Sequence, residues 1–428
     1  MRLLRLKLSL KDKVAFMSDR LRTVAIIGQG YVGLPLAMAA VDAGWSVIGV
    51  ENSQSKYEGI AAGISPVEDV SSVTMQAAMD AGKYKISNSV SDVSTASIVV
   101  ICVPTPLNEE REPDLVILES AVSAIAPHLA SGTLVISEST SYPGTVRDVV
   151  APMIARLKSS ADIQVDIAVA PERVNPGDVK YHQKNTPRLV GGLDAVSTKR
   201  AVDFYNTICD EVVEVSTPEI AETAKLLENT FRLVNIALVN QLAQLCADQN
   251  INVHEVIDAA STKPYGYMKF TPSVGVGGHC IPVDPMYLSW WAEKNGSKAS
   301  IIDESEAINL GMPIYVSKRV RALIPAGAKS KRVLIMGVAY KPGVSDVRET
   351  PATALRDDLI AQGCEVAWLD PLVSEWDGLT PVGVDWGCDA AVVATAQPGM
   401  PVAVIAARGV PVLDCTGAFA HLENVTRL

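Results

Sequence analysis

Short apolar runs alternate with longer helical segments over the first half of the chain. The runs 24–27, 46–50, 98–103, 134–137 and 166–170 are rich in Val and Ile, and each leads into a glycine or a polar turn. Continuous apolar runs of this length are typical of strands that are buried on both faces of a parallel sheet. The pattern therefore predicts an α/β domain built on an open, doubly wound parallel sheet.

Beyond Ser216 the apolar positions follow a helical period. The segment 216–249 opens with Ser-Thr-Pro-Glu, which combines a cap residue with a first-turn proline, and it then continues without Gly or Pro. This segment predicts one long, largely buried helix. Two further helices are predicted, over 253–261 and about 302–323.

A second α/β pattern begins at Arg332. It predicts one helix and four strands, at about 351–362 and at 333–337, 365–370, 390–394 and 410–413. We therefore expect two Rossmann-like, doubly wound parallel-sheet domains joined by a helical middle domain with a long central helix. The expected parts are a leader that we predict to be disordered and three domains, at 1–20 and at 21–215, 216–325 and 326–428.

Composition narrows the choice of partners and location. A length of 428 residues favours two or three domains, and a formal charge of −11 argues against nucleic acid as a partner. No uninterrupted apolar span reaches the ~18 residues that a transmembrane helix needs, so no membrane partner is expected. The seven cysteines are scattered without a CxxC pair, which indicates reduced thiols and a cytoplasmic location.

The sequence GQGYVG at 28–33 stands between a predicted strand and a predicted helix. In this context the first glycine allows a tight turn, the second lets a pyrophosphate approach the backbone, and the third lets helix and strand pack closely. Glu51 ends the next strand, 18 residues after Gly33. A carboxylate there binds a ribose diol and repels a 2′-phosphate, so the motif predicts NAD rather than NADP as the cofactor.

Glycines crowd around one cysteine, Cys280, and Asp284 follows it four residues later. The glycines allow the backbone to bend sharply and would let a ligand approach the thiol. A thiolate is a nucleophile that holds a substrate carbonyl covalently, so the loop predicts a catalytic cysteine. The alternative is a glycine-rich turn around a buried cysteine that packs as a small hydrophobe.

Three further sets of polar residues are candidates for a site. Lys225 and Asn229 are four residues apart and share one face of the long helix, where a buried lysine needs a partner or a ligand. Glu172 follows the fifth predicted strand and is a candidate base. Lys341 and Arg348 lie on a strand-to-helix loop and suit the phosphates of a second nucleotide. Taken singly, the helix pair and the glutamate are more typical of a solvated surface than of a site.

The order of these parts resembles the UDP-glucose/GDP-mannose dehydrogenase family over nearly everything after Arg22. The matching stretches are GQGYVG at 28–33, VPTP at 103–106, ESTSYPGT at 138–145, APERVNPG at 170–177, KLLENTFR at 225–232, GVGGHCIPVDP at 275–285 and GVAYKPGVSDVRETP at 337–351. The resemblance implies oxidation of a sugar CH2OH to a carboxylate by two hydride transfers to NAD. It further implies a thiohemiacetal and then a thioester on Cys280, and a homodimer or higher assembly formed through the central helix.

The resemblance also implies roles for individual residues. Lys225 and Asn229 would stabilise a developing oxyanion, and Asp284 would handle protons or orient the lysine and a water. Glu172 would be the general base, with Thr140 holding a water near it. The implied cofactor-binding residues are Gly28, Gly30, Tyr31, Val32, Gly33, Glu51, Thr105 and Thr140. The implied substrate-binding residues are Glu172, Arg173, Lys225, Asn229, Gly277, Lys341 and Arg348.

Two positions depart from the glucose-oxidising relatives. Pro176 stands where those relatives commonly have a second glutamate, and His279 precedes Cys280 where they tend to have serine. The segments PER at 171–173 and GGHC at 277–280 resemble the branch that acts on UDP-N-acetylhexosamines, such as UDP-GlcNAc or UDP-ManNAc. No cluster among the other four histidines would complete a metal site with His279, so no metal is expected.

Three other interpretations fit parts of this pattern. The first is a UDP-glucose 6-dehydrogenase of the same family. The second is a hydroxyacid or phosphogluconate type of oxidoreductase, which transfers one hydride and uses no thiol. The third is a non-catalytic sensor that binds NAD and a UDP-sugar. The intact set of Cys280, Lys225, Asn229 and Asp284 argues against the sensor, because a sensor need not keep all four residues.

Overall fold

The structure is a computed structural model, and it describes residues 22–174, 180–328 and 330–428. The predicted leader at 1–20 and Pro176 lie outside the described residues. The chain divides into two compact units, Met1–Leu226 and Leu227–Leu428, and this division falls within a single helix. The three predicted domain boundaries stay a prediction.

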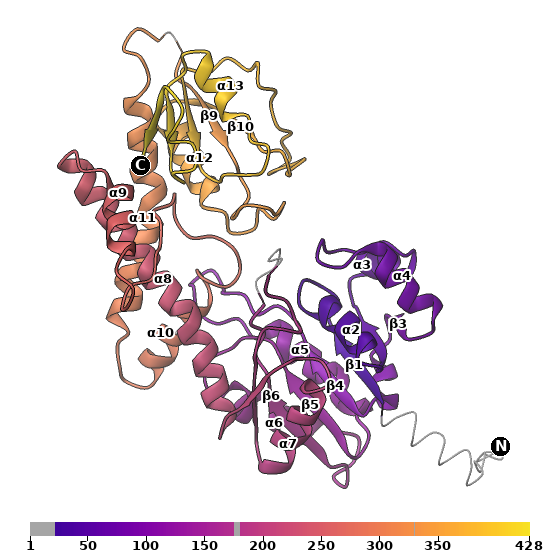
Figure 1. Cartoon of the computed structure of the whole chain (residues 1–428). Coiled ribbons are helices and arrows are strands. Elements are labelled where there is room, and N and C mark those ends of the chain that lie inside the picture. Colours follow the sequence, from indigo (N-terminus) through magenta and orange to yellow (C-terminus); the bar gives the residue numbers. More distant parts are fainter. Residues whose placement is uncertain (1–21, 175–179, 329) are drawn as a thin grey trace. The chain divides into compact units, whose positions relative to one another are not determined.

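The first unit is built on an eight-stranded sheet with the order β3-β2-β1-β4-β5-β6-β7-β8 (Figure 1). Strands β1 to β6 run parallel in the strand order of a Rossmann fold, as predicted. The strands are β1 (Thr23–Ile27), β2 (Ser46–Val50), β3 (Tyr84–Ser87), β4 (Ile98–Ile101), β5 (Thr133–Ser137), β6 (Val165–Val169), β7 (Arg188–Gly192) and β8 (Val212–Glu214). The α-helices are α2 (Gly33–Asp42), α3 (Gln54–Ala61), α4 (Ser72–Asp80), α5 (Val116–Ile125), α6 (Ala151–Leu157) and α7 (Ala195–Tyr205).

One strand pair departs from the predicted parallel sheet. β7 is antiparallel to β6, and Ala168 faces Gly192 across the pair. A parallel return needs a long crossover, usually a helix, and no helix lies among the described residues between these two strands. The antiparallel return brings Arg188, the first residue of β7, to the edge of the sheet where β5 and β6 end. This placement matters for the site described below.

The helical middle of the chain contains the predicted long helix. It is α8 (Pro218–Asp248), followed by α9 (Val253–Ser261), α10 (Asp284–Lys294) and α11 (Ser300–Ala322). The predicted bounds of α8, α9 and α11 agree to within two residues. α10 was not predicted, because its Asp-Pro start directly follows the glycine-rich loop and its apolar pattern is short.

The second unit also contains a five-stranded parallel sheet with the order β10-β9-β11-β12-β13 (Figure 1). This is the second common order of doubly wound sheets, and it confirms the prediction of two such folds. The strands are β9 (Arg332–Met336), β10 (Glu365–Leu369), β11 (Ala390–Val393), β12 (Val412–Asp414) and β13 (Val425–Arg427), and the helices are α12 (Pro351–Ala361) and α13 (Val402–Ala407). The three-residue β13 was not predicted, since its run Val-Thr-Arg is too short and too polar to stand out.

Each sheet turns after its first strand at a glycine that no other residue can replace without strain. Gly28 has a φ of +90° and Gly337 has a φ of +80°, both in the left-handed region. A Cβ atom at Gly28 would lie 2.6 Å from the carbonyl oxygen of Cys102. At Gly337 it would lie 1.9 Å from the carbonyl oxygen of Thr395. Both turns are therefore closed against the neighbouring strand.

We predict that Gly337→Ala destabilises the second unit by roughly 2–5 kcal/mol, because the left-handed φ costs ~1–2 kcal/mol and forced overpacking adds ~1–3 kcal/mol. Gly343→Ala is the matched control, since its φ is +79° but no atom lies within 4 Å of its Cβ position. The control is expected to lose only the conformational part. Urea unfolding of the two variants measures both losses, and equal losses would contradict the packing argument.

Candidate functional site

The glycine turn at 28–33 has the geometry of a dinucleotide site. Gly28 closes the turn, and a Cβ on Gly33 would lie 1.9 Å from the carbonyl oxygen of Gly28. At Gly30, in contrast, a Cβ would meet no atom within 4 Å. The open space at the second glycine and the close contacts at the first and third match the three roles expected of the motif. α2 starts at Gly33, so its N-terminal amides lie at this turn.

Glu51, the predicted ribose ligand, also holds the turn together. Its buried carboxylate accepts hydrogen bonds from the main-chain amides of Gln29 at 3.0 Å and Ser53 at 2.9 Å. A carboxylate offers about four lone-pair sites, so these two bonds leave acceptor capacity for a ribose diol. The Gln29 side chain is fixed in turn, because it donates to the carbonyl oxygen of Ile26 and accepts from the Tyr84 hydroxyl.

Thr105 and Thr140 come together at the ends of β4 and β5. The Thr105 hydroxyl donates to the carbonyl oxygen of Thr140 at 2.6 Å. A second bond between the same loops runs from the Ser139 hydroxyl to the carbonyl oxygen of Val103 at 2.7 Å. Ligands of open α/β sheets bind beyond the carboxyl ends of the strands, which is where this pair lies.

Glu172, the predicted base, follows β6 and is held from several sides. Its carboxylate accepts a hydrogen bond from the Val174 amide and a longer one of 3.4 Å from the Gln183 side chain. Arg188 forms an ion pair with it at 3.6 Å. Burial raises the pKa of Glu172, but Arg188, the Val174 amide and Lys225 outweigh burial and bring that pKa below its ordinary value. Glu172 is therefore ionised at neutral pH.

The cysteine loop is shaped by chain packing. A Cβ at Gly277 would lie 2.6 Å from the carbonyl oxygen of Glu349, and one at Gly278 would lie 2.8 Å from the Tyr340 ring. These glycines make room for the 340–351 loop. The approach of a ligand to the thiol stays a prediction. Cys280 itself is exposed, and its carbonyl oxygen accepts the Asp284 amide at 2.9 Å.

Asn229 and Asp284, both predicted, form a buried pair in the second unit. The Asn229 side-chain amide donates to the Asp284 carboxylate at 2.5 Å, and both residues are more than nine-tenths buried. Lys225 lies one turn before Asn229 on α8 and is also buried. The second unit therefore carries Cys280, Asn229 and Asp284, and the first unit carries Lys225 and Glu172.

The loop that follows β9 contains the predicted phosphate ligands. The Arg348 guanidinium pairs with Asp346 through two bonds, Nε to Oδ1 at 2.9 Å and Nη2 to Oδ2 at 2.6 Å. The Lys341 ammonium lies 5.7 Å from the centre of the Tyr340 ring.

Partial burial lowers the pKa of His279, and Arg348 lowers it further, so the imidazole is neutral at pH 7. Arg173, in the first unit, donates to the carbonyl oxygen of Pro187 at 2.7 Å.

Three buried polar residues around Glu172 were not assigned from the sequence. They are Glu138, which directly follows β5, Arg188, which begins β7, and Tyr205, which ends α7. The available signal was a charged residue at each end of an apolar run, Ile-Ser-Glu and Arg-Leu-Val. That signal is weak, because charged residues at strand ends are usually solvated.

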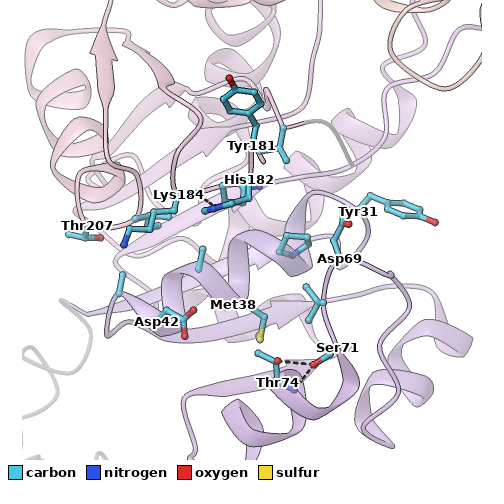
Figure 2. A pocket seen from close by; sticks show the side chains of 17 residues that line it. Tyr31, Met38, Asp42, Asp69, Ser71, Thr74, Tyr181, His182, Lys184 and Thr207 are labelled. Atoms are coloured by element: carbon cyan, nitrogen blue, oxygen red, sulfur yellow. Dashed lines mark hydrogen bonds between the residues drawn. The ribbon is translucent and has the colours of Figure 1, made fainter. Parts of the chain in front are cut away.

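A cavity of about 510 Å³ opens on the first unit, beside α2 (Figure 2). Its walls include Met38 and Asp42 on α2, and His182 and Lys184 on the segment that leads to β7. Of the predicted cofactor residues that the structure describes, Tyr31 alone lines it. The cavity is therefore distinct from the edge formed by Thr105, Thr140 and Glu51.

Within the described ranges, no group of three or more His, Cys, Asp or Glu side chains has a metal-binding arrangement. Among these same residues, no helix combines the length and the apolar character required to cross a bilayer. No disulfide joins the seven cysteines.

Three family models match the chain in the order of its folds. They are the NAD binding domain, the central domain and the UDP binding domain of the UDP-glucose/GDP-mannose dehydrogenase family, at residues 22–209, 219–310 and 334–402. The three matches cover strands β1 to β7 of the first sheet, most of the helical middle, and the region of β9 to β11 in the second sheet.

Individual relatives cover most of the chain. A UDP-N-acetyl-D-mannosamine dehydrogenase from Methanocaldococcus jannaschii is 34% identical over 353 residues, which is 82% of this chain and 79% of the relative. A UDP-N-acetyl-D-glucosamine 6-dehydrogenase from Pseudomonas aeruginosa is 33% identical over 84% of this chain and 86% of its own length. The solved structure of a UDP-D-ManNAc dehydrogenase from Pyrococcus horikoshii has a TM-score of 0.83 at 31% identity, over 92% of this chain and 95% of that one.

We predict that Asn229→Asp destabilises the second unit by about 3 kcal/mol at neutral pH, because two buried carboxylates would then stand at hydrogen-bond distance. One of them binds a proton as the pH falls, so the loss should shrink toward acidic pH. Asn235→Asp on the same helix is the control, since Asn235 bonds only to the carbonyl oxygen of Phe231 near the surface. Thermal unfolding between pH 5 and 8 measures the difference, and a loss that is independent of pH would contradict the carboxylate pair.

Proposed function

The chain belongs to the UDP-glucose/GDP-mannose dehydrogenase family, and we propose that it oxidises the C6 hydroxymethyl group of a UDP-N-acetylhexosamine to a carboxylate. It is an NAD-dependent oxidoreductase. The observation that carries the proposal is the exposed Cys280 beside the buried Asn229–Asp284 pair, in a chain that also carries the dinucleotide turn. The names of the relatives support an N-acetylhexosamine as the sugar.

In the proposed mechanism the Cys280 thiolate holds the substrate through the second oxidation. Bound NAD would supply the hydride acceptor, with one NAD molecule used for each of the two oxidations. The thiolate adds to the carbonyl carbon of the aldehyde and forms a thiohemiacetal. Its oxidation leaves a thioester, and water then cleaves the carbon–sulfur bond to give the acid and the free thiol. Covalent capture explains how one enzyme performs both oxidations without releasing an aldehyde.

The other residues receive their roles from their charge or from the hydrogen bonds that they donate and accept. The Lys225 ammonium and the Asn229 amide are donors suited to a developing oxyanion. Glu172 is ionised and is therefore able to accept the proton of the substrate hydroxyl, with Thr140 holding a water. Asp284 orients Asn229 through the bond described above.

We assign the UDP portion to the family's UDP binding domain and to the loop that packs on the cysteine glycines. Arg348 and Lys341 are the candidate phosphate ligands on that loop, while Gly277 and Arg173 belong to the proposed sugar subsite. His279 stands next to Cys280, and GGHC together with PER resembles the N-acetylhexosamine branch. The absence of disulfides fits a cytoplasmic enzyme.

We predict that the protein forms two NADH per sugar with UDP-GlcNAc or UDP-ManNAc and little NADH with UDP-glucose. The measurement is NADH absorbance against sugar consumed, over a panel of UDP-sugars. One NADH per sugar would favour a single-hydride oxidoreductase, and binding without NADH would favour a sensor. Preference for UDP-glucose would favour the glucose-oxidising branch.

Cysteine variants test the covalent step within the same assay. Cys280→Ala is expected to lose nearly all activity. Cys388→Ala, which changes a partly buried cysteine just before β11, should keep it. Cys280→Ser is expected to accumulate a slowly hydrolysed ester, visible as a mass increment on the intact protein. Wild-type turnover by Cys280→Ser would contradict the thioester scheme.

We also propose a homodimer or higher assembly that forms through α8. Phe231, Leu238 and Leu245 are 45%, 60% and 60% exposed and are spaced seven residues apart, so they share one face of the helix. Leu227 is 60% exposed one turn before Phe231. An apolar stripe of this length is unusual for a monomer surface, and burial against a second copy would remove it from water.

We predict that Leu238→Glu shifts the assembly toward a 45.5 kDa monomer. The introduced carboxylates would be buried at the centre of the interface without partners. Val404→Glu on α13 is the control, because Val404 is 49% exposed but lies outside the stripe. Light scattering after gel filtration gives the mass. A monomeric wild type, or an assembly that Leu238→Glu leaves intact, would rule out this interface.

A further inference from the structure

One guanidinium in the first unit is shared between two buried carboxylates. Arg188 Nη1 lies 3.3 Å from Glu138 Oε2 and 3.6 Å from Glu172 Oε2. The Arg188 side chain is 2% exposed, and those of Glu138 and Glu172 are 0% and 12% exposed. Two further bonds, from Nη1 to the carbonyl oxygen of Pro171 at 3.2 Å and from Nη2 to Gln183 Oε1 at 2.5 Å, help to fix the plane of the guanidinium.

The sheet topology explains why these three residues meet. Glu138 follows β5 and Glu172 follows β6, and the antiparallel β7 begins at Arg188 on the same edge. Tyr205 closes the cluster from α7: its hydroxyl donates to Glu138 Oε1 at 2.5 Å, and its ring centre lies 5.2 Å from the guanidinium carbon. The Gln183 side chain also bridges Arg188 and Glu172, because it accepts a hydrogen bond from Arg188 and donates one to Glu172.

Charge balance makes the two carboxylates unequal. If both were ionised, the buried trio would carry a net charge of −1. Burial raises the pKa of Glu138 to about 7, against the opposing effect of Arg188 and with a further increase from Glu172. Glu172 has the additional main-chain donor Val174 and the influence of Lys225, and its pKa is lowered. Between the lowered pKa of Glu172 and about pH 7, Glu138 therefore holds a proton and Glu172 does not.

Apart from Lys225, the other titratable groups that face the trio stay neutral. Burial raises the pKa of Cys102 and Tyr205 well above their ordinary values, and it also raises the pKa of Cys209. The Cys209 thiol donates to the carbonyl oxygen of Gln183 at 3.2 Å, as a protonated sulfur does. The charges that act on Glu172 are those of Arg188, Lys225 and, once ionised, Glu138.

We propose that Arg188 and Glu138 are positioning residues for Glu172: the guanidinium holds the Glu172 carboxylate ionised and in place, and Glu138 controls how much of that positive charge Glu172 receives. The inference rests on the proposed function for the role of Glu172 as a base. When Glu138 loses its proton, the positive charge of Arg188 is divided between two carboxylates. The pKa of Glu172 then rises, so Glu172 accepts a proton more readily than it does while Glu138 is neutral.

Titration of the carboxyl groups tests the coupling directly. The experiment records NMR spectra of protein labelled at the glutamate side-chain carboxyl carbons, from acidic pH to pH 9, with signals assigned by single Glu→Gln variants. In the wild type, Glu138 is expected to titrate near pH 7, and the Glu172 signal to show a small second inflection at the same pH. Glu222, also buried with a pKa of about 7, is identified by Glu222→Gln.

Variants at Glu138 and at Arg188 have different expected effects on the Glu172 signal. Glu138→Gln keeps the shape of the side chain and the acceptor for the Tyr205 hydroxyl, so this variant should fold. The second inflection of the Glu172 signal should vanish. The acidic midpoint of Glu172 should stay, because Glu138 is already neutral at that pH. Arg188→Met should raise that midpoint by about one pH unit or more, and Arg188→Lys should restore part of the shift. An inflection that survives Glu138→Gln, or a midpoint unmoved by Arg188→Met, would overturn the proposal. A merely structural role would change stability without moving either signal.

Kinetics separates this proposal from the proposed function. With active protein, the acidic limb of kcat/KM for the UDP-sugar should move to higher pH in Arg188→Met by the same interval as the Glu172 midpoint. If the carboxyl titrations behave as expected but no UDP-sugar yields NADH, the proposed function fails and the control of Glu172 stands. If NADH forms and the titrations show no coupling, the control of Glu172 fails alone.

Discussion

The turn after the first strand of each sheet depends on a carboxylate from the neighbouring strand. Glu51, which follows β2, accepts the amides of Gln29 and Ser53. Asp370, which follows β10, accepts the amides of Val338 at 2.9 Å and Leu372 at 2.9 Å. The amides of Gln29 and Val338 are buried in sharp turns, and leaving such an amide unpaired would cost ~1–3 kcal/mol. Both glycine turns, and the loops they present, rest on this pairing.

A third carboxylate, on the long helix α8, also accepts main-chain amides of a loop. Glu222, buried on α8, accepts the amides of Gly144 at 2.7 Å and Val146 at 3.0 Å, in the loop that follows β5. Lys225 lies three residues further along α8, so one bond pair fixes the helix face that carries Lys225 against the loop that carries Thr140. Burial raises the pKa of Glu222 to about 7, and its two amide donors oppose the rise.

The sequence predicted what depends on long, regular patterns. The central helix, the parallel strands β1 to β6 other than β3, and the glycine turn all have strong local signals. β7 was not predicted, because Arg188 and the two glycines that end it disguise an apolar run. The close packing at Gly277 and Gly278 was not predicted, for a related reason: their neighbours, Glu349 and Tyr340, are more than sixty residues away in the chain. Contacts between segments that are distant in the chain produce no local sequence pattern from which they could be predicted.

The same limit applies to the trio around Glu172, and its energetics suggest why it exists. Moving a guanidinium from water into the protein interior costs several kcal/mol, and the charge of one arginine cannot fully neutralise two ionised carboxylates. Apolar side chains of similar volume would serve stability at least as well. Strongly shifted pKa values gather where chemistry needs them, and here the lowered pKa belongs to the residue proposed as the base. The raised pKa belongs to Glu138, which our proposed mechanism leaves out of contact with substrate. Because Arg188 is buried between Glu172 and Glu138, the ionisation of Glu138 changes the pKa of Glu172.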